Sequence, residues 1–242
     1  MRKALVLTGA TKGLGLSLFE TCISTGYSVL GFYGRDHAAA EDLRRLTEAK
    51  GISPQLMAWD FRTPDDPPPE IPAALQRLNG MELAFIHCAC APFLPKAFHM
   101  TDWKEGLDQF MVAAGGAWRI AQLVLPAMVR ARRGTIAFVL SSAMSDRSIP
   151  NPKGLSGYLV AKHALAGLAS CIAAEYSSSG VRVLTFSPQF MDTPLTRNWP
   201  ESTRALASRN GSVDPDTYAK YILRRIEDPT LQAPTSGLPL ML

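Results

Sequence analysis

A phenol and an ammonium group stand four residues apart in the segment Tyr158-x-x-x-Lys162. In a helix, this spacing places both side chains on one face. A free tyrosine has a pKa of about 10, and a neighbouring ammonium stabilises the phenolate and lowers that value. Such a phenol could deliver a proton to a carbonyl oxygen as hydride reaches the carbon. Taken alone, the pair is more often an ordinary helix with an exposed lysine and a half-buried tyrosine, because this spacing is common.

A hydroxyl group follows the apolar run that ends at Val139-Leu140, where Ser141 and Ser142 stand side by side. At the end of a strand, Ser142 could polarise a bound carbonyl group. The alternative is a turn serine that satisfies its own backbone. The three side chains of Ser142, Tyr158 and Lys162 are therefore the candidate catalytic residues.

A glycine-rich turn near the start of the chain predicts a dinucleotide site. The apolar run from Leu5 to Leu7 is followed by Gly9, Gly13 and Gly15, and then by a helix-like pattern. Such a turn lets backbone N–H groups approach a pyrophosphate at the start of a helix. The spacing G-x-x-x-G-x-G differs from G-x-G-x-x-G, and a plain strand–helix turn would also use glycine for its backbone freedom.

The end of the second predicted strand indicates which nicotinamide cofactor is preferred. An acidic residue there would favour NAD, but the chain has Arg35, which can hold a 2′-phosphate in a bidentate fork. Lys12 could add a second positive charge, although both cations could also be solvated surface residues. We therefore expect NADPH or NADP, with NAD less favoured, and the nearby Asp36 keeps NAD open. Asp60 could bind the adenine amino group or cap a turn.

The order of predicted elements fixes the fold class. The pattern predicts strands over residues 4–8, 27–33, 55–59, 83–86, 136–140 and 181–186. It predicts helices over residues 14–25, 38–50, 103–132, 157–176 and about 214–226, with a proline-rich loop over 62–72. Strands that alternate with helices imply an α/β fold, a doubly wound parallel sheet with helices on both faces. We expect one domain over residues 1–242, with a substrate lid over 194–213.

Composition excludes several classes of protein. At 242 residues, with 47% hydrophobic residues and a net charge of +4, the chain is typical of a soluble globular protein. It has no aromatic and basic cluster that would indicate nucleic-acid binding. We expect no signal peptide, no membrane-spanning stretch and a cytoplasmic location. The Cys88-Ala89-Cys90 segment lacks a second ligand pair, so we expect no metal site.

Together these residues resemble the short-chain dehydrogenase/reductase family in its single-domain, Rossmann-like form. The resemblance covers essentially the whole chain. Within the family, the chain is similar to reductases of 3-oxoacyl groups on acyl carrier protein. It implies that Ser142, Tyr158 and Lys162 are catalytic, and that Lys162 also holds the nicotinamide ribose. The implied cofactor-binding residues are Gly9, Thr11, Lys12, Gly13, Leu14, Gly15, Arg35, Asp60, Tyr158, Lys162, Pro188 and Thr193.

The chain departs from the family pattern at four places. The usual Asn-Asn-Ala-Gly is His87-Cys88-Ala89-Cys90, and the helix asparagine that supports the catalytic lysine falls on Ala113. His87 could substitute in part, although a core histidine is the commoner reading of such a residue. Gln189 puts a side chain where the family keeps room beside the nicotinamide, and the segment 236–239 lacks the usual Asp-Gly-Gly.

Two functions follow from these observations. The first is an NADPH-dependent reductase of a ketone or 3-oxoacyl group, either a small molecule or an acyl thioester. The second is a cofactor-binding partner subunit with little chemistry of its own. Family members are commonly dimers or tetramers built through two long helices, so we expect a homo-dimer or homo-tetramer, with a hetero-oligomer as the alternative. Acyl carrier protein is a further candidate partner, because Arg130, Arg132 and Arg133 could meet an acidic carrier, or could simply form a solvated helix end.

Overall fold

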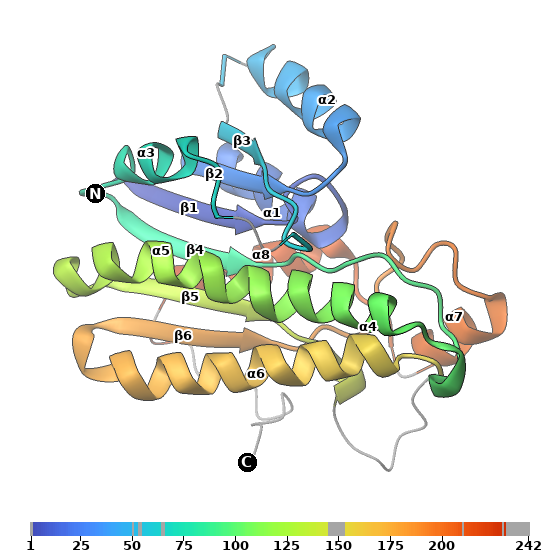
Figure 1. Ribbon diagram of the computed structural model, residues 1–242. Helices are drawn as coiled ribbons and strands as arrows, with labels where there is room; N and C mark the ends of the chain where they lie inside the picture. The colour runs from blue at the N-terminus through green and yellow to red at the C-terminus, as the bar shows by residue number, and fades with distance from the viewer. Residues whose placement is uncertain are drawn as a thin grey trace.

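The centre of the molecule is a sheet of six parallel strands in the order β3-β2-β1-β4-β5-β6 (Figure 1). The computed structural model describes residues 2–49, 51–52, 55–63, 66–144, 153–209, 211–228 and 230. The strands are β1 (Lys3–Thr8), β2 (Ser28–Tyr33), β3 (Gln55–Ala58), β4 (Glu82–His87), β5 (Gly134–Val139) and β6 (Val181–Phe186). The strand order reverses next to β1, and doubly wound sheets bind their ligands outside the carboxyl ends at such a point.

Helices cover both faces of this sheet, as the alternating pattern predicts. One face carries α3 (Glu70–Gln76), α5 (Gly116–Ala131) and α6 (Ser156–Tyr176). The other carries α1 (Gly13–Ser24), α2 (His37–Glu48) and α8 (Pro215–Glu227). The predicted Rossmann-like, doubly wound α/β domain is confirmed.

Each strand contributes side chains to two hydrophobic cores. Val6 and Phe85 face the core beneath α5 and α6, whereas Leu5 and Ile86 face the core beneath α1 and α8. Because neighbouring side chains on a strand point to opposite faces, a strand that is covered on both sides must be apolar at every position. This explains why the short apolar runs of the sequence identify the strands.

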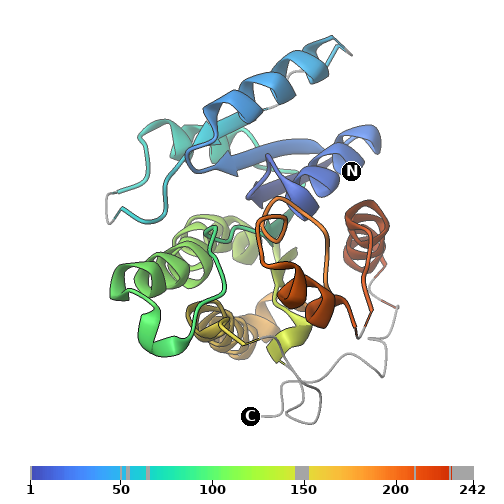
Figure 2. The ribbon, with the colours of Figure 1, turned by 90° about the vertical axis from the view of Figure 1, so that its right-hand side faces the viewer.

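The carboxyl ends of the strands gather the loops that form the site. Figure 2 looks onto these ends, with the segment that contains α7 (Glu201–Ser208) in front of the sheet. The sequence pattern did not predict α7, which lies inside the expected lid over 194–213. The expected proline-rich loop over 62–72 ends in the first residues of α3.

The long helical segment predicted over 103–132 is interrupted. It consists of α4 (Trp103–Phe110), a π-helical turn over Met111–Gly115, and α5. Gly115 and Gly116 stand at the end of the π-helical turn, and glycine has a low helix propensity. Turns of this kind occur frequently at functional sites.

Two helical segments correct the expectation that no apolar stretch approaches membrane-spanning length. Residues Trp103–Ala131 and Ser156–Ser179 are long and apolar enough to span a bilayer by length and composition. The apolar windows of these segments are 50% and 33% buried inside the protein, respectively, against the sheet. Core helices of soluble proteins also meet this criterion, so it is weak evidence for a membrane.

Candidate active site

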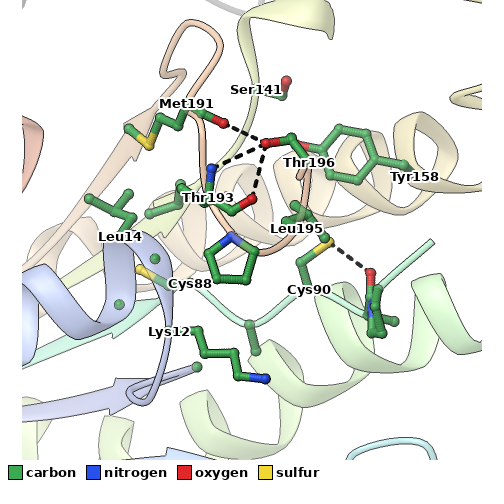
Figure 3. Close-up of a pocket in the computed structure, with 18 of the residues that line it drawn as sticks. Lys12, Leu14, Cys88, Cys90, Ser141, Tyr158, Met191, Thr193, Leu195 and Thr196 are labelled. Atoms are coloured by element: carbon green, nitrogen blue, oxygen red, sulfur yellow. Dashed lines mark hydrogen bonds between the residues drawn. The ribbon is translucent and has the colours of Figure 1, made fainter. Parts of the chain in front are cut away.

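A cavity of about 850 Å³ lies along the carboxyl edge of the sheet. Every residue that the sequence assigns to catalysis or cofactor binding lines this cavity: Gly9, Thr11, Lys12, Gly13, Leu14, Gly15, Arg35, Asp60, Ser142, Tyr158, Lys162, Pro188 and Thr193. In Figure 3, Lys12 lies at one end, and Ser141 and Tyr158 lie at the other. We call these the nucleotide end, formed by residues 9–15 and the ends of β2 and β3, and the catalytic end, formed by Ser141, Ser142, Tyr158 and Lys162.

The glycine loop at the nucleotide end requires glycine at defined positions. Gly9 and Gly13 have φ angles of +72° and +51°, which favour glycine. A Cβ atom at Gly15 would overlap the carbonyl oxygen of Gly9. The side chain of Lys12, at the N-cap of α1, makes no capping hydrogen bond. The first turn of α1 therefore presents backbone N–H groups and the positive end of a helix dipole, which suit a pyrophosphate.

The basic residues at this end are paired with carboxylates. Arg35 Nε lies 2.7 Å from Asp60 Oδ2, and Arg62 Nε lies 2.7 Å from Asp60 Oδ1. Although partial burial by itself would raise the pKa of Asp60, the hydrogen bonds from Arg62 and Arg35 outweigh it and lower the pKa to about 2. Because both oxygens of Asp60 already accept hydrogen bonds from arginine, its role in adenine binding stays a prediction.

A second ion pair joins Lys12 to Asp36. The hydrogen bond from Lys12, together with that from the backbone N–H of Ala39, lowers the pKa of the Asp36 carboxyl. Asp36 also caps the N-terminus of α2 through the Ala39 bond, at 3.1 Å. Arg35 and Lys12, the two cations expected to bind a 2′-phosphate, therefore both lie at the nucleotide end of the cavity. Each of them already has an acidic partner.

The catalytic pair lies on α6, as the four-residue spacing predicts. Lys162 is 2% exposed, and its Nζ donates a hydrogen bond of 2.6 Å to the carbonyl oxygen of Val139. The same Nζ lies 5.6 Å from the centre of the Tyr158 ring. Burial raises the pKa of Tyr158 and lowers the pKa of Lys162. The tyrosine pKa is therefore not lowered in this structure as the pairing with Lys162 predicted, because burial penalises the phenolate.

Two serines reach the catalytic end. Ser141 forms a side-chain hydrogen bond with Tyr158, which favours the phenolate but does not offset burial. Ser142 also lines the cavity, and its backbone N–H donates to the carbonyl oxygen of Pro188 at 3.0 Å. The sequence singled out Ser142 alone. The adjacent serine was the signal for a second hydroxyl, and the catalytic role of Ser142 stays a prediction.

An aromatic group holds the ring of Tyr158 from the side of the lid. Phe93 stacks on Tyr158 with ring centres 5.2 Å apart and an interplanar angle of 19°. Trp199, from the expected lid, lies 5.3 Å from the Phe93 ring and donates its indole N–H to the Phe93 carbonyl oxygen at 3.3 Å. The sequence predicted a lid over 194–213, which includes Trp199, but nothing in it pointed to Phe93.

His87 is a buried core residue, as its commoner interpretation predicts. The hydroxyl of Thr8 accepts hydrogen bonds from the backbone N–H groups of Cys88 and Ala89 and lies 2.8 Å from His87 Nδ1. The Thr8 hydroxyl must therefore donate its proton to Nδ1, which assigns the proton of the neutral ring to Nε2. Burial, reinforced by the charge of Lys162, lowers the pKa of His87 to about 3.

The position of the missing asparagine lies in the π-helical turn. Ala113 is buried there, and His87 Nε2 faces the backbone of Val112 and Ala113 without a well-formed hydrogen bond among the described residues. The departure in segment 236–239 lies outside the described residues. Sequence reasoning also missed the buried Gln109, which stands four residues before Ala113.

Comparison with known proteins identifies the family. The profile described as short chain dehydrogenase matches residues 3–204. The chain belongs to the short-chain dehydrogenase family. Oxidoreductase UcpA of Escherichia coli strain K12 is 24% identical over 238 residues, which cover 94% of this chain and 83% of UcpA.

Two further relatives extend the comparison. The 3-dehydrosphinganine reductase TSC10B of Arabidopsis thaliana is 25% identical over 218 residues, which cover 88% of this chain and 64% of that protein. The crystal structure of a short-chain dehydrogenase from Streptomyces avermitilis shares the fold, with a TM-score of 0.76, 22% identity, and coverage of 96% of this chain and 86% of that one. Membership of this oxidoreductase family implies a nicotinamide cofactor, NAD or NADP, and the glycine loop fits one.

Proposed function

We propose that this protein is an NADPH-dependent reductase that converts a ketone or 3-oxoacyl group to an alcohol. The observation that supports it best is the shared cavity, because the glycine loop and the Ser142, Tyr158 and Lys162 side chains line the same space. The loop over residues 9–15, with Pro188 and Thr193, would hold the cofactor. When bound, the reduced nicotinamide supplies the hydride.

The protein's own side chains handle the proton and the carbonyl group. Burial raises the pKa of Tyr158, so the phenol keeps its proton at neutral pH and can donate it to the carbonyl oxygen. Ser142 would orient that oxygen, and the hydroxyl of Ser141 would hold the phenol. The ammonium of Lys162, beside the Tyr158 ring, would stabilise the phenolate left after proton transfer.

The basic residues at the nucleotide end support NADPH rather than NADH. Arg35 is 68% exposed in its ion pair with Asp60, and Lys12 is 55% exposed in its pair with Asp36. Exposed ion pairs contribute little stability, so both cations can turn to a 2′-phosphate at small cost. Arg62 would then keep Asp60 neutralised.

The lining of the catalytic end supports a neutral, apolar carbonyl substrate. Lys162 is the one charged side chain among the described residues that line this end, and it is bound to Val139. Leu155, Leu195 and Trp199 supply apolar surface around it. One relative is named as a reductase of 3-dehydrosphinganine, which is in keeping with a ketone substrate. A carrier-bound 3-oxoacyl thioester would also be a neutral substrate, with acyl carrier protein as the partner.

Exposed aromatic side chains support self-association through the long helices. Trp103 of α4 and Trp118 of α5 are 81% and 57% exposed, and Val160 of α6 is 63% exposed. Large apolar side chains exposed on neighbouring helices are a surface that association would remove from water. A homo-dimer or homo-tetramer would cover it, and so would a hetero-oligomer.

The second candidate is a cofactor-binding subunit that is weak or inactive by itself. It is favoured by Ala113, which removes a polar group from the helix, and by Gln189, whose side chain packs against Gly211 at the cavity. The first test is to mix the purified protein with NADPH or NADH and a panel of apolar ketones, charged 2-oxo acids and 3-oxoacyl thioesters. Consumption of NADPH with an apolar ketone or thioester supports the reductase, whereas tight NADPH binding without turnover of any carbonyl compound supports the subunit.

A further inference from the structure

Gln109 is a buried amide that the proposed reaction does not use. It is the last polar residue of α4 before the π-helical turn, and only 3% of it is exposed. Its Nε2 donates a hydrogen bond of 2.8 Å to the carbonyl oxygen of Ala91, and its Oε1 accepts one of 3.5 Å from the Cys90 thiol. A long polar side chain loses conformational freedom and hydration on burial, so both ends need partners. Here both partners belong to one loop.

That loop leads from the end of β4 to the ring that covers Tyr158. Cys90 lies at the cavity wall, and Phe93, three residues later, stacks on Tyr158. The Gln109 side chain also packs beside α6, because a Cβ atom at Gly157 would lie 3.7 Å from Gln109 Cγ. Gly157 directly precedes Tyr158. Gln109 is therefore hydrogen-bonded to the loop and lies beside the start of α6, the two segments that carry Phe93 and Tyr158.

We propose that Gln109 is a positioning residue that fixes the Cys90–Phe93 loop and, through it, the ring of Tyr158. Position 113 carries alanine where the family has a supporting asparagine, so no side-chain amide is available there. Gln109 supplies an amide one helical turn earlier in the same helical segment, and this amide donates a hydrogen bond to the carbonyl oxygen of Ala91 in the loop. This inference rests on the proposed reductase function, since positioning has meaning only for a working site.

The most specific test replaces Gln109 by glutamate. A protonated carboxyl group has the shape of the amide and can still donate to Ala91, whereas the ionised form cannot donate and faces a carbonyl oxygen. The groups that titrate nearby are Cys90 from the loop and Tyr158 and Lys162 from α6, while Glu105 and Asp108 of α4 form ion pairs with Lys96 and Lys104. We expect Gln109→Glu to approach wild-type kcat at pH 6 and to fall at least about fivefold below it by pH 8.5.

Two companion variants separate positioning from folding. Gln109→Met keeps the volume and removes both hydrogen bonds, and we expect kcat about 10-fold lower at every pH with the NADPH Kd unchanged. Gln122→Glu makes the glutamate substitution on the exposed face of α5 and should match wild type. A pH-independent ratio for Gln109→Glu, or wild-type kcat in Gln109→Met with only a lower Tm, would overturn the proposal. If Gln109→Met does not fold, the pH profile of Gln109→Glu decides.

A substrate-free readout distinguishes this proposal from the reductase itself. Alkylation of Cys90 by iodoacetamide, followed by peptide mass spectrometry, needs no turnover. We expect Gln109→Met to speed Cys90 alkylation several-fold, because the thiol loses its amide partner, and Gln122→Glu to leave it unchanged. If wild type reduces no carbonyl compound, the proposed function fails, while faster alkylation would still show that Gln109 fixes the loop. Equal alkylation rates in wild type and Gln109→Met would show that it does not.

Discussion

At the nucleotide end of the cavity the backbone shapes the site, whereas at the catalytic end buried side chains shape it. The glycine loop needs only the absence of side chains at Gly9, Gly13 and Gly15 and the N–H groups of α1. The catalytic end instead depends on side-chain contacts, such as those of Phe93 with Tyr158 and of Gln109 with the loop. This difference explains why the glycine loop keeps its family pattern, whereas the residues that support Ser142, Tyr158 and Lys162, such as His87–Cys90 and Ala113, depart from it. The role of one side chain can be taken over by another side chain from a neighbouring turn. The close approach of the backbone to a pyrophosphate, in contrast, requires glycine at these positions.

Apart from Tyr158, the two serines of the catalytic end should give the largest effects on the rate. We expect Ser142→Ala to lower kcat about 100-fold, because it removes the hydroxyl that orients the carbonyl group. Ser141→Ala should cost less, about 10-fold, because it removes hydrogen bonds to Tyr158 and from the Ala143 N–H but not the hydroxyl that orients the carbonyl group. Steady-state kinetics with NADPH and the best ketone of the panel measure both. The reverse order would reassign the catalytic hydroxyl to Ser141.

At the nucleotide end, a side-chain substitution should alter the preference for NADPH over NADH rather than abolish cofactor binding. We expect Arg35→Ala to raise the Kd for NADPH about 10-fold, the value of one charge-assisted hydrogen bond, and to leave the Kd for NADH unchanged. Fluorescence titration of both cofactors makes the measurement. Arg44→Ala, at a cation that lies on α2 and donates to Leu56, is the control. An equal loss for NADPH and NADH would mean that Arg35 does not read the 2′-phosphate.

His87 should give the smallest effect, on stability rather than on rate. Its pKa is about 3 in the folded protein and about 6.5 when exposed, so the unfolded chain binds more protons below pH 6.5. The contribution of the neutral buried ring is thus complete above pH 6.5 and is lost as the pH falls towards 3. We expect the Tm of wild type to drop about 4–8 °C more than that of His87→Asn between pH 7 and pH 5. Parallel Tm curves would show that His87 is not the group responsible.

Much of the fold could be predicted from local pattern. Strands that are buried on both faces are short apolar runs in the sequence, and glycine turns mark where they begin or end. The six strands, and a parallel sheet in which helices connect them, could therefore be predicted. The interruption at Met111–Gly115 could not be predicted, because a π-helical turn has the same apolar pattern as the helix around it. The short α7 has no buried apolar stripe of its own that would reveal it.

The site divides in the same way. Spacing along one helix placed Tyr158 beside Lys162, and the family resemblance led to the cavity that all the assigned residues line. Spacing could not show that Lys162 donates to Val139 or that burial raises the pKa of Tyr158, because both depend on tertiary packing. The contacts of Phe93 and Gln109 join separate segments of the chain, so no local sequence pattern indicates them.

The role of Tyr158 as proton donor is tested most directly by comparing wild type with Tyr158→Phe. The variant keeps the ring that stacks on Phe93 and removes only the hydroxyl. With saturating NADPH and a neutral apolar ketone, we expect the variant to oxidise NADPH at least about 100-fold more slowly, because its proton donor is gone. Equal rates of NADPH oxidation in the two proteins would contradict it.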